Sequence, residues 1–351
     1  MGDDARVVEL LASHLGLDLA NLSESSHHRI YDYYLPVCLH VLSKVRESRE
    51  DSHARCVSRA ILPPIHCVRV DSPQRPVIFR FVCRGPVTFG ISAPQGCGKT
   101  TLVAALFHVL TELGLRVASA SIDDFYLTRA DQVALAERHD GNPLLLYRGN
   151  AGSHDLALGR SVLESLKGLA DPGATVAVPR YDKSLHAGKG DRAPESAWQR
   201  VEGPLDVVLF EGWMLGFQPL GAAAVSAVSA DLVAVDHYLH AYQLEWDALV
   251  DQWVVVEVGS PEWVFDWRLQ AEHDMKATGK PGMTDDEVRD FCERFQPAYR
   301  AYLPKLYSSP PPLATEDRVL RIKIAKDRSL RSPIQPHKAS IRQGNMPALR
   351  R

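Results

Sequence analysis

The chain reads VTFGISAPQGCGKTTL over residues 87–102. The apolar, β-branched run from Val87 to Ile91 predicts a buried strand, and the pattern that follows Gly98 predicts a helix. Between them, Gly96 and Gly98 let backbone N–H groups turn inward around phosphate oxygens, and the helix N-terminus adds a partial positive charge. A strand, a small-residue loop and a helix in this order are typical of a phosphate-binding P-loop.

Two side chains complete this motif. Lys99 can reach the β- and γ-phosphates, and the Thr100 hydroxyl can coordinate Mg²⁺, so ATP and Mg²⁺ are the expected cofactors. The strict pattern begins with glycine, where this chain has Ala93, and a glycine-rich turn before a helix is the alternative interpretation. The residues expected at the nucleotide are Pro94, Gln95, Gly96, Cys97, Gly98, Lys99, Thr100 and Thr101.

Composition and charge exclude several classes of protein. Of 351 residues, 40 are basic and 43 acidic, and the net charge of -3 gives no electrostatic case for binding nucleic acid or an anionic membrane. No uncharged apolar run reaches the roughly 18 residues of a transmembrane helix. The six cysteines lack the spacing of metal sites, which indicates reduced thiols. A soluble, monomeric enzyme with a small-molecule substrate is expected.

The N-terminus carries no visible targeting peptide. Asp3, Asp4 and Glu9 conflict with the acid-poor composition of organelle transit peptides, and no apolar signal core follows them. The sequence therefore predicts either a cytoplasmic protein or one whose presequence has been removed.

Acidic residues follow two of the predicted strands. Asp123 and Asp124 come after the second strand, and Glu211 after the third. The carboxyl ends of parallel strands share one edge, where open α/β sheets bind ligands. We expect Asp123 to be the base that accepts a hydroxyl proton, and Thr100, Asp123 and Glu211 to be the Mg²⁺ ligands. Helix capping is the alternative role for these acids, with Asp124 the better candidate for it.

Two polar segments between these strands look like the site of an acceptor substrate. Residues 147–155 and 178–192 combine guanidinium, imidazole, ammonium and carboxylate groups with several glycines. Such a cluster suits an anionic ligand, and an ordinary solvated surface is the alternative. The expected acceptor-binding residues are Asp123, Tyr126, Arg148, His154, Asp155, Arg180, Tyr181, Lys183, Lys189 and Arg192.

A helix expected to open at Pro261, with Ser260 as its capping residue, carries Arg268 and Glu272 at i,i+4 spacing. The pair could be only a surface ion bridge. In P-loop kinases, however, a helix after the fourth strand supplies an arginine to the moving phosphoryl group, and we expect Arg268 in that role. Thr284 with Glu287 makes a capping box and predicts a further helix. The expected catalytic residues are Lys99, Asp123, Glu211 and Arg268.

Periodicity divides the chain into four parts. Residues 1–50 read as helices, 51–85 as an irregular insertion or linker, 86–327 as a P-loop kinase domain with a lid at 260–285, and 328–351 as a basic, disordered tail. Strands are predicted at Val87–Ile91, Arg116–Ile122, Val207–Phe210, Trp253–Val258 and Val319–Ile324. Their alternation with helices predicts a three-layer α/β P-loop NTPase fold with a mainly parallel five-stranded sheet.

From about Pro86 to Ile324 the chain resembles the plant-type D-glycerate 3-kinases. The strings that carry the resemblance are GISAPQGCGKTTL, SIDDFYLT, YRGNAGSHDL, VPRYDKS, GKGDR, LFEGWMLGF, WRLQAE and GMTDDEV. The P-loop, the DDFY element and the EG turn are shared with phosphoribulokinase, uridine kinase and pantothenate kinase relatives. The strings YRGNAGSHDL and LFEGWMLGF are far more specific.

The resemblance implies a reaction of ATP with D-glycerate that gives 3-phosphoglycerate and ADP, the closing step of the photorespiratory glycolate pathway in plants. It implies Lys99 and Thr100 at the nucleotide and Mg²⁺, Asp123 as the base and Glu211 near the metal. It also implies a chloroplast location. Two other classes stay open: a P-loop kinase for pantothenate, uridine or a sugar phosphate, and a non-catalytic ATP-binding switch protein.

Overall fold

The structure is a computed structural model that describes residues 3–59, 85–279, 282–332 and 334. Its centre is a five-stranded sheet with the strand order β2-β7-β1-β8-β9, in which every neighbouring pair is parallel. The strands are β1 Val87–Ser92, β2 Val117–Ser121, β7 Val207–Gly212, β8 Gln252–Val258 and β9 Val319–Ile324. The parallel five-stranded sheet expected from the sequence is confirmed.

Helices and two small antiparallel ribbons surround this sheet. The helices are α1 Asp3–Leu15, α2 Glu24–His27, α3 Leu35–Arg59, α4 Lys99–Glu112, α5 Arg129–Arg138, α6 Leu156–Lys167, α7 Ala222–Ser226, α8 Leu232–Glu245, α9 Trp263–Ala277, α10 Asp285–Glu293 and α11 Gln296–Ser308. A π-helical turn, η1 (His28–Tyr34), joins α2 to α3, and a 3₁₀ turn, η2 (Ile122–Phe125), follows β2. The ribbons pair β3 Thr175–Val178 with β6 Gln199–Glu202, and β4 Tyr181–Asp182 with β5 Asp191–Arg192.

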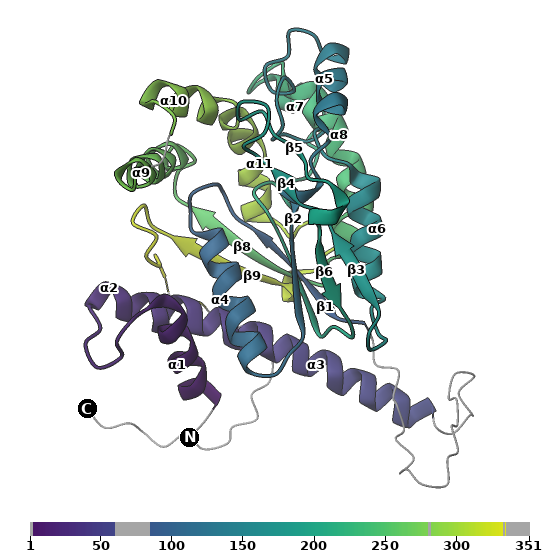
Figure 1. Ribbon diagram of the computed structural model, residues 1–351, viewed down its shortest axis with the longest axis vertical. Helices are drawn as coiled ribbons and strands as arrows, with labels where there is room; N and C mark the ends of the chain where they lie inside the picture. The colour runs from purple at the N-terminus through teal and green to yellow at the C-terminus, as the bar shows by residue number, and fades with distance from the viewer. Residues whose placement is uncertain (1–2, 60–84, 280–281, 333, 335–351) are drawn as a thin grey trace.

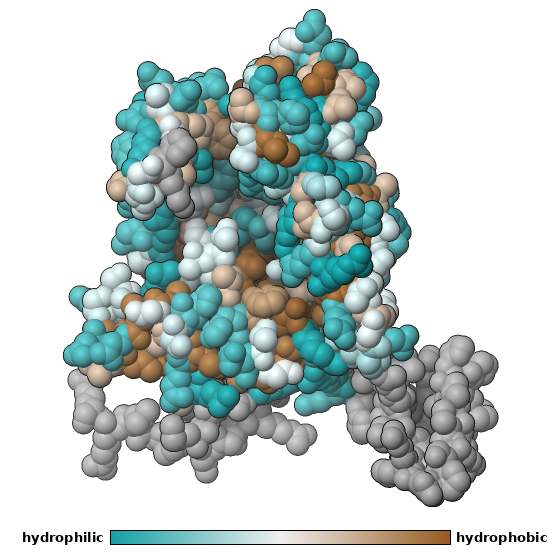
Figure 2. Space-filling model, viewed as in Figure 1, coloured by the Kyte–Doolittle hydropathy of each residue, from teal (hydrophilic) through white to brown (hydrophobic). Residues whose placement is uncertain are grey.

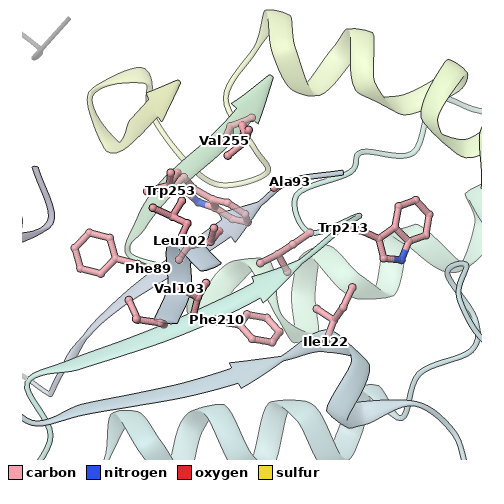
Figure 3. Packing of buried hydrophobic residues seen from close by; sticks show 14 of the residues in the cluster. Phe89, Ala93, Leu102, Val103, Ile122, Phe210, Trp213, Trp253 and Val255 are labelled. Atoms are coloured by element: carbon pink, nitrogen blue, oxygen red, sulfur yellow. The ribbon is translucent and has the colours of Figure 1, made fainter. Parts of the chain in front are cut away.

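Helices lie on both sides of the sheet, as Figure 1 shows. Helix α4 packs on β2 and β7 with α1 and α3 outside it, while α6 and α8 lie on the other side. All six residues of β1 are buried, including the polar Thr88 and Ser92, because a parallel sheet of this kind is covered on both faces. In the core, buried side chains of β1, β7, β8 and α4 pack together, among them Phe89, Phe210, Trp253 and Leu102 (Figure 3).

Two predicted boundaries were wrong. Helix α3 continues to Arg59, so residues 51–59 are helical and do not belong to an irregular linker. The sequence there, DSHARCVSR, lacks an apolar face, and hydrophobic periodicity detects helices that bury one. The tail also begins later than expected, because residues 325–331 form a turn in which the amide of Arg331 donates to the carbonyl of Lys323 (2.8 Å). Residues 60–84 and 335–351, which carry the rest of these two predictions, lie outside the described residues.

Helices α9 and α10 occupy the region expected to be a lid. Helix α9 begins at Trp263 and not at Pro261. The hydroxyl of Ser260 accepts a hydrogen bond from the amide of Glu262 (3.3 Å) in the turn before the helix. The predicted capping box of α10 is confirmed: the Thr284 hydroxyl accepts from the Glu287 amide (3.2 Å), and the Glu287 carboxylate accepts from the Thr284 amide (2.7 Å).

Membrane insertion finds no support among these elements. None of the helices in the described part of the chain has the length and apolar character needed to cross a bilayer.

Candidate active site

The loop between β1 and α4 has the geometry of an anion cradle. Gly96 (φ +77°) and Gly98 (φ +99°) adopt left-handed backbone conformations, which residues with side chains rarely do. A Cβ atom on Gly96 would lie 2.7 Å from the Cβ of Trp267 in α9. On its other side, the amide of Gln95 donates to the buried hydroxyl of Tyr299 in α11 (3.1 Å). The loop is thus held directly before the N-terminus of α4, whose free amides suit phosphate oxygens.

The lysine of this loop is paired with the acid that ends β7. Lys99 and Glu211 form an ion pair, and their side chains are only 15% and 14% exposed. The sheet brings them together, because Glu211 lies opposite Ile91 in the parallel register and the loop begins two residues after Ile91. Burial lowers the pKa of Lys99, although the nearby Asp123 carboxylate opposes that shift.

Asp123 stands in η2, directly after β2, and is held by a second lysine. Its carboxylate accepts a hydrogen bond from Nζ of Lys183 (2.6 Å). Burial by itself would raise the pKa of Asp123, but the ammonium groups of Lys183 and Lys99 outweigh that effect, so the pKa lies below the ordinary aspartate value. The side chain is therefore a carboxylate at neutral pH, as a proton acceptor must be.

Asp124 has a structural role instead, as expected. Its carboxylate accepts from the amide of Ser121 (3.1 Å) in the capping box of η2 and pairs with Arg180 (3.1 Å). Burial raises the pKa of Asp124, and Arg180 partly offsets this. Of the two neighbouring carboxylates, Asp123 is the one that faces the large cavity.

That cavity, of about 980 Å³, runs along the P-loop. All eight residues from Pro94 to Thr101 line it, together with Asp123, Lys183 and Arg268. Figure 2 shows the molecule hollowed on this face. A second cavity of about 580 Å³ borders Thr100, Glu211 and Arg180. Of the three predicted metal ligands, Thr100 lines both cavities, Asp123 lines only the large one and Glu211 only the second.

Beside Asp123, the predicted acceptor residues form a buried aromatic layer. The rings of Tyr126 and His154 stack with centroids 4.5 Å apart, and Nδ1 of His154 lies 2.7 Å from the hydroxyl of Tyr242. Burial lowers the pKa of His154 to about 3, so the imidazole is neutral and supplies no positive charge to an anion. Its Nε2 atom is buried without a partner in the described structure.

Two other predicted acceptor-binding residues, Asp155 and Arg192, form an ion pair with each other. Asp155 caps α6 by accepting from the amide of Leu158 (3.0 Å), and it pairs with Arg192 (3.0 Å). Nε of Arg192 is buried and has no hydrogen-bond partner among the described residues.

The cluster around Arg148 lies apart from the P-loop. Its guanidinium stands 5.4 Å from the ring centroid of Tyr181 and donates to the carbonyls of Gly188 and Lys189. Arg148, Tyr181 and Lys189 are not among the described residues that line the two cavities. The Tyr181 ring packs edge-on against Tyr126 with centroids 5.2 Å apart, so this cluster adjoins the aromatic layer beside Asp123 without lining either cavity.

Arg268 both forms the predicted ion pair with Glu272 and lies at the cavity of the P-loop. It forms the i,i+4 ion pair with Glu272, whose side chain is 3% exposed, and it also lines the large cavity. Its guanidinium stands 5.5 Å from the ring centroid of Phe291 in α10.

Sequence reasoning missed two parts of the cavity wall. One is Arg328, in the turn after β9, whose Nε donates to the carbonyl of Gly96 in the P-loop (2.9 Å). The other is the N-terminal segment of α2 and η1, including Arg29 and Tyr34. A usable signal for Arg328 was its position just after the last parallel strand, at the sheet edge that carries ligands. No local pattern marked the N-terminal segment.

Comparison with known proteins places this geometry in a family. The chain is 52% identical over 244 residues, 70% of its length, to the chloroplastic D-glycerate 3-kinase of Arabidopsis thaliana. It is 40% identical over 228 residues to the uncharacterized kinase mug58 of Schizosaccharomyces pombe, and it covers 81% of that protein. The solved structure of D-glycerate 3-kinase from Cryptococcus neoformans matches with a TM-score of 0.65 and 31% identity, over 82% of this chain and 98% of that one.

The chain belongs to the D-glycerate 3-kinase family. No protein-family model matches it. It spans 54% of the length of the Arabidopsis D-glycerate 3-kinase, about half of that relative.

The residues at the P-loop fit Mg²⁺ held jointly by protein and nucleotide. In the described ranges no group of three or more His, Cys, Asp or Glu side chains could hold a metal by itself. Mg²⁺ prefers one or two carboxylates, hydroxyls, water and phosphate oxygens to an all-protein cage. The Thr100 hydroxyl and the Glu211 carboxylate, which border the same cavity, offer that donor set for this member of the D-glycerate 3-kinase family.

Replacing Gly96 by alanine should damage nucleotide binding specifically. The added Cβ would meet the Cβ of Trp267, which cannot rotate away, so the loop must move out of its phosphate-binding conformation. We expect ATP affinity to fall at least about tenfold in calorimetric titrations, the loss of a charge-assisted hydrogen bond or more. The matched control is Gly114→Ala, which has a similar φ of +83° but open space around its Cβ. It should lose about 1 kcal/mol of stability and bind ATP normally; equal ATP affinity in both variants would contradict this account of the loop.

Proposed function

We propose that the protein transfers the γ-phosphoryl group of ATP to D-glycerate, giving 3-phospho-D-glycerate and ADP. The observation that carries the proposal is the placement of Asp123, an ionised carboxylate, in the same cavity as the whole P-loop. Support for the substrate comes from the D-glycerate 3-kinases of Arabidopsis and Cryptococcus, to which the chain is similar.

In this mechanism the C3 hydroxyl oxygen of glycerate attacks the γ-phosphorus in line with the bond to ADP, which breaks. The hydroxyl proton passes to Asp123, which orients the oxygen through a hydrogen bond before it accepts the proton. Lys99 exchanges Glu211 for β- and γ-phosphate oxygens, and so neutralises charge on the moving group. The protein contributes mainly position and electrostatic stabilisation, which is what phosphoryl transfer requires.

Release of Glu211 from Lys99 frees its carboxylate for Mg²⁺, with Thr100 as the second protein ligand. Mg²⁺ held by these two residues would neutralise negative charge on the phosphates. The Lys99–Glu211 pair thus keeps both charges satisfied in the nucleotide-free protein.

For the acceptor carboxylate we propose Lys183 and Nε of Arg192 as ligands. Lys183 contacts Asp123 directly, and Nε of Arg192 is buried without a partner in the described structure. Arg148 and Arg180 are weaker candidates because their guanidinium groups already bind carbonyl oxygens and Asp124, respectively. A different acceptor, such as pantothenate, uridine or a sugar phosphate, is the alternative for the same P-loop.

We propose the chloroplast as the compartment, since the Arabidopsis relative is described as chloroplastic. Imaging of the full-length protein fused to a fluorescent reporter tests this location. A monomer in solution, measurable by light scattering, remains the expected assembly.

A panel of acceptors with Mg-ATP tests the substrate. D-Glycerate should be used with a kcat/KM at least about tenfold above that for glycerol or glyceramide, since losing a charge-assisted hydrogen bond costs roughly 1.5–3 kcal/mol. ADP release measures turnover, and phosphorus NMR identifies the hydroxyl that is phosphorylated. Equal use of glycerol would exclude recognition of the carboxylate, and preference for pantothenate or uridine would favour the alternative function.

Removing the proton acceptor should abolish most turnover without changing the affinity for ATP. We expect Asp123→Asn to lower kcat about 10²- to 10⁴-fold, the usual contribution of a positioned base, and to leave the Kd for ATP almost unchanged. Asp182→Asn is the matched control, because Asp182 is exposed, accepts hydrogen bonds from the nearby Ser184 and does not line the large cavity. Survival of kcat within a few-fold in Asp123→Asn would show that another group is the base.

The pH profile provides a second test of Asp123. Because its pKa is lowered, the acid limb of kcat/KM in the wild type should lie below the ordinary value of 3.8 and leave the rate flat through neutral pH. Lys183→Ala removes a cation that favours the carboxylate form, so the limb should move to higher pH. An unchanged limb in Lys183→Ala would contradict the assigned contact.

A comparison of two variants tests Arg268. If Arg268 stabilises the moving phosphoryl group, Arg268→Ala should lower kcat by up to about 10³-fold, the low end for arginine fingers, with ATP affinity preserved. Glu272→Gln removes the ion pair but keeps the side chain that accepts from the Met283 amide (3.1 Å), and it should keep most of its kcat. Equal, small losses in both variants would assign α9 a structural role only.

A further inference from the structure

The β4–β5 hairpin (residues 181–192) carries Lys183, one of the two proposed ligands of the acceptor carboxylate, in its tip. Residues 182–189 are all exposed, so the tip buries little surface. His186 (φ +54°) and Ala187 (φ +55°) adopt left-handed backbone conformations there, which cost energy in residues that have a Cβ atom. Neither burial nor backbone preference therefore fixes the tip, and contacts with other parts of the chain must do so.

The base of the hairpin is anchored on residues that follow β2. Arg192 donates to the carbonyl of Tyr126 (3.1 Å), and the carboxylate of Asp191 accepts from the amide of Arg129 (2.9 Å). The ring of Tyr181 packs edge-on against the ring of Tyr126, with centroids 5.2 Å apart. These contacts all involve β4 or β5, so they hold the base of the hairpin and leave the tip to other contacts.

Arg148 joins the tip to the base. Its Nη1 atom donates to the carbonyls of Gly188 (2.9 Å) and Lys189, and its guanidinium stands 5.4 Å from the ring centroid of Tyr181. Gly190 (φ +77°) makes this approach possible, because a Cβ atom there would lie 2.5 Å from Cε1 of Tyr181 and 3.0 Å from Nη1 of Arg148. A guanidinium can stack on a ring with its face while its N–H groups bind oxygen atoms, so one side chain holds both ends of the hairpin.

The tip brings Lys183 into the proposed acceptor site. Nζ of Lys183 donates to the carboxylate of Asp123 (2.6 Å), and Lys183 lines the large cavity although its side chain is 57% exposed. Arg148 is not among the described residues that line that cavity. Figure 1 shows β4 and β5 next to the end of β2, after which Asp123 stands. An exposed lysine has many rotamers, so its Nζ stays at Asp123 only while the backbone of the tip stays in place.

We propose that Arg148 latches the tip of the β4–β5 hairpin to its base and so positions Lys183 at the acceptor site. The sequence predicts Arg148 as a ligand of the acceptor. Its Nη1 atom is instead bound to hairpin carbonyls and its side chain lies outside the large cavity, which makes it a positioning residue. This inference rests on the proposed function, in which Lys183 binds the acceptor carboxylate.

A lysine-specific protease tests the latch without any substrate, because Lys183 and Lys189 both lie in the exposed tip. Loss of two hydrogen bonds should let the tip open about tenfold more often, so Arg148→Ala should be cleaved at these lysines about tenfold faster than the wild type. Mass spectrometry identifies the cleavage sites. Arg148→Met keeps an apolar stem over Tyr181 but has no donors, and it should be cleaved as fast as Arg148→Ala.

Arg160→Ala is the matched control. Arg160 in α6 is also half-buried and donates to a backbone carbonyl of another helix, that of Leu244 (3.4 Å), so its loss should leave cleavage of the tip at the wild-type rate. Hydrogen exchange provides the same comparison. The amide of Gly190, which donates to the carbonyl of Leu185 (2.8 Å), should exchange about tenfold faster in Arg148→Ala and normally in Arg160→Ala.

Steady-state kinetics then separates a latch from a ligand. If Arg148 acts through Lys183, Arg148→Ala should raise the KM for D-glycerate about tenfold and leave the Kd for ATP unchanged. Lys183→Ala should show a similar loss. The double variant should lose no more than about twofold beyond Lys183→Ala, because the effects of residues that act as one unit do not add.

Two results would overturn the proposal. One is wild-type cleavage and exchange in both Arg148→Ala and Arg148→Met, which would show that Arg148 does not hold the tip. The other is a double variant in which the two losses multiply, which would make Arg148 a ligand of the acceptor itself. A wild-type enzyme that does not phosphorylate glycerate would refute the proposed substrate, whereas the protease and exchange measurements would still decide whether the latch exists.

Discussion

The ion pair between Lys99 and Glu211 is the interaction on which the site depends. Burying an ammonium group without a partner would cost several kcal/mol, so the lysine of a P-loop that awaits its nucleotide needs a carboxylate beside it. The parallel register of β1 and β7 supplies that carboxylate at the edge where α4 begins. In the mechanism proposed above, the pair parts when phosphate oxygens replace Glu211 at Lys99 and Mg²⁺ replaces Lys99 at Glu211, which would link the stability of the nucleotide-free site to its chemistry.

The other polar residues of the site differ in whether their charged groups are already engaged in ion pairs or hydrogen bonds. Asp124 with Arg180 and Asp155 with Arg192 form pairs that hold turns and helix ends, and Arg148 is bound to backbone carbonyls. Such groups have few free donors for a substrate, and of these three arginines only Arg192 keeps a buried donor, Nε, without a partner in the described structure. Asp123 differs because its partner, Lys183, is 57% exposed and can move toward an acceptor while the carboxylate stays ionised. In contrast to these paired residues, Arg29 and Arg328 at the cavity wall form no ion pair with a carboxylate within the described residues.

Helix α9 contacts several parts of the site through the side chain of Trp267. Trp267 touches the space above Gly96, lies beneath the Arg328 guanidinium and donates to the turn after β9. Helix α9 also carries Arg268, one residue later. A shift of α9 toward bound nucleotide would therefore be felt by the P-loop, the turn after β9 and the lid arginine together, because all three contact the same short stretch of helix.

Local sequence patterns were sufficient to predict the strands, the P-loop, the capping box at Thr284 and the acids at the ends of β2 and β7. Each of these features depends on residues that are neighbours in sequence. The signals were the alternation of strands with helices, the glycines of the loop and the acids at the carboxyl ends of strands. They failed for residues 51–59, where a helix has no apolar face to reveal it. They also failed for Arg29 and Arg328, which become neighbours of the P-loop only when chain ends nearly 300 residues apart pack on one sheet edge. Which of ten polar acceptor candidates stay free, and which are consumed by ion pairs, likewise depends on partners that are distant in sequence, and only the tertiary structure decides it.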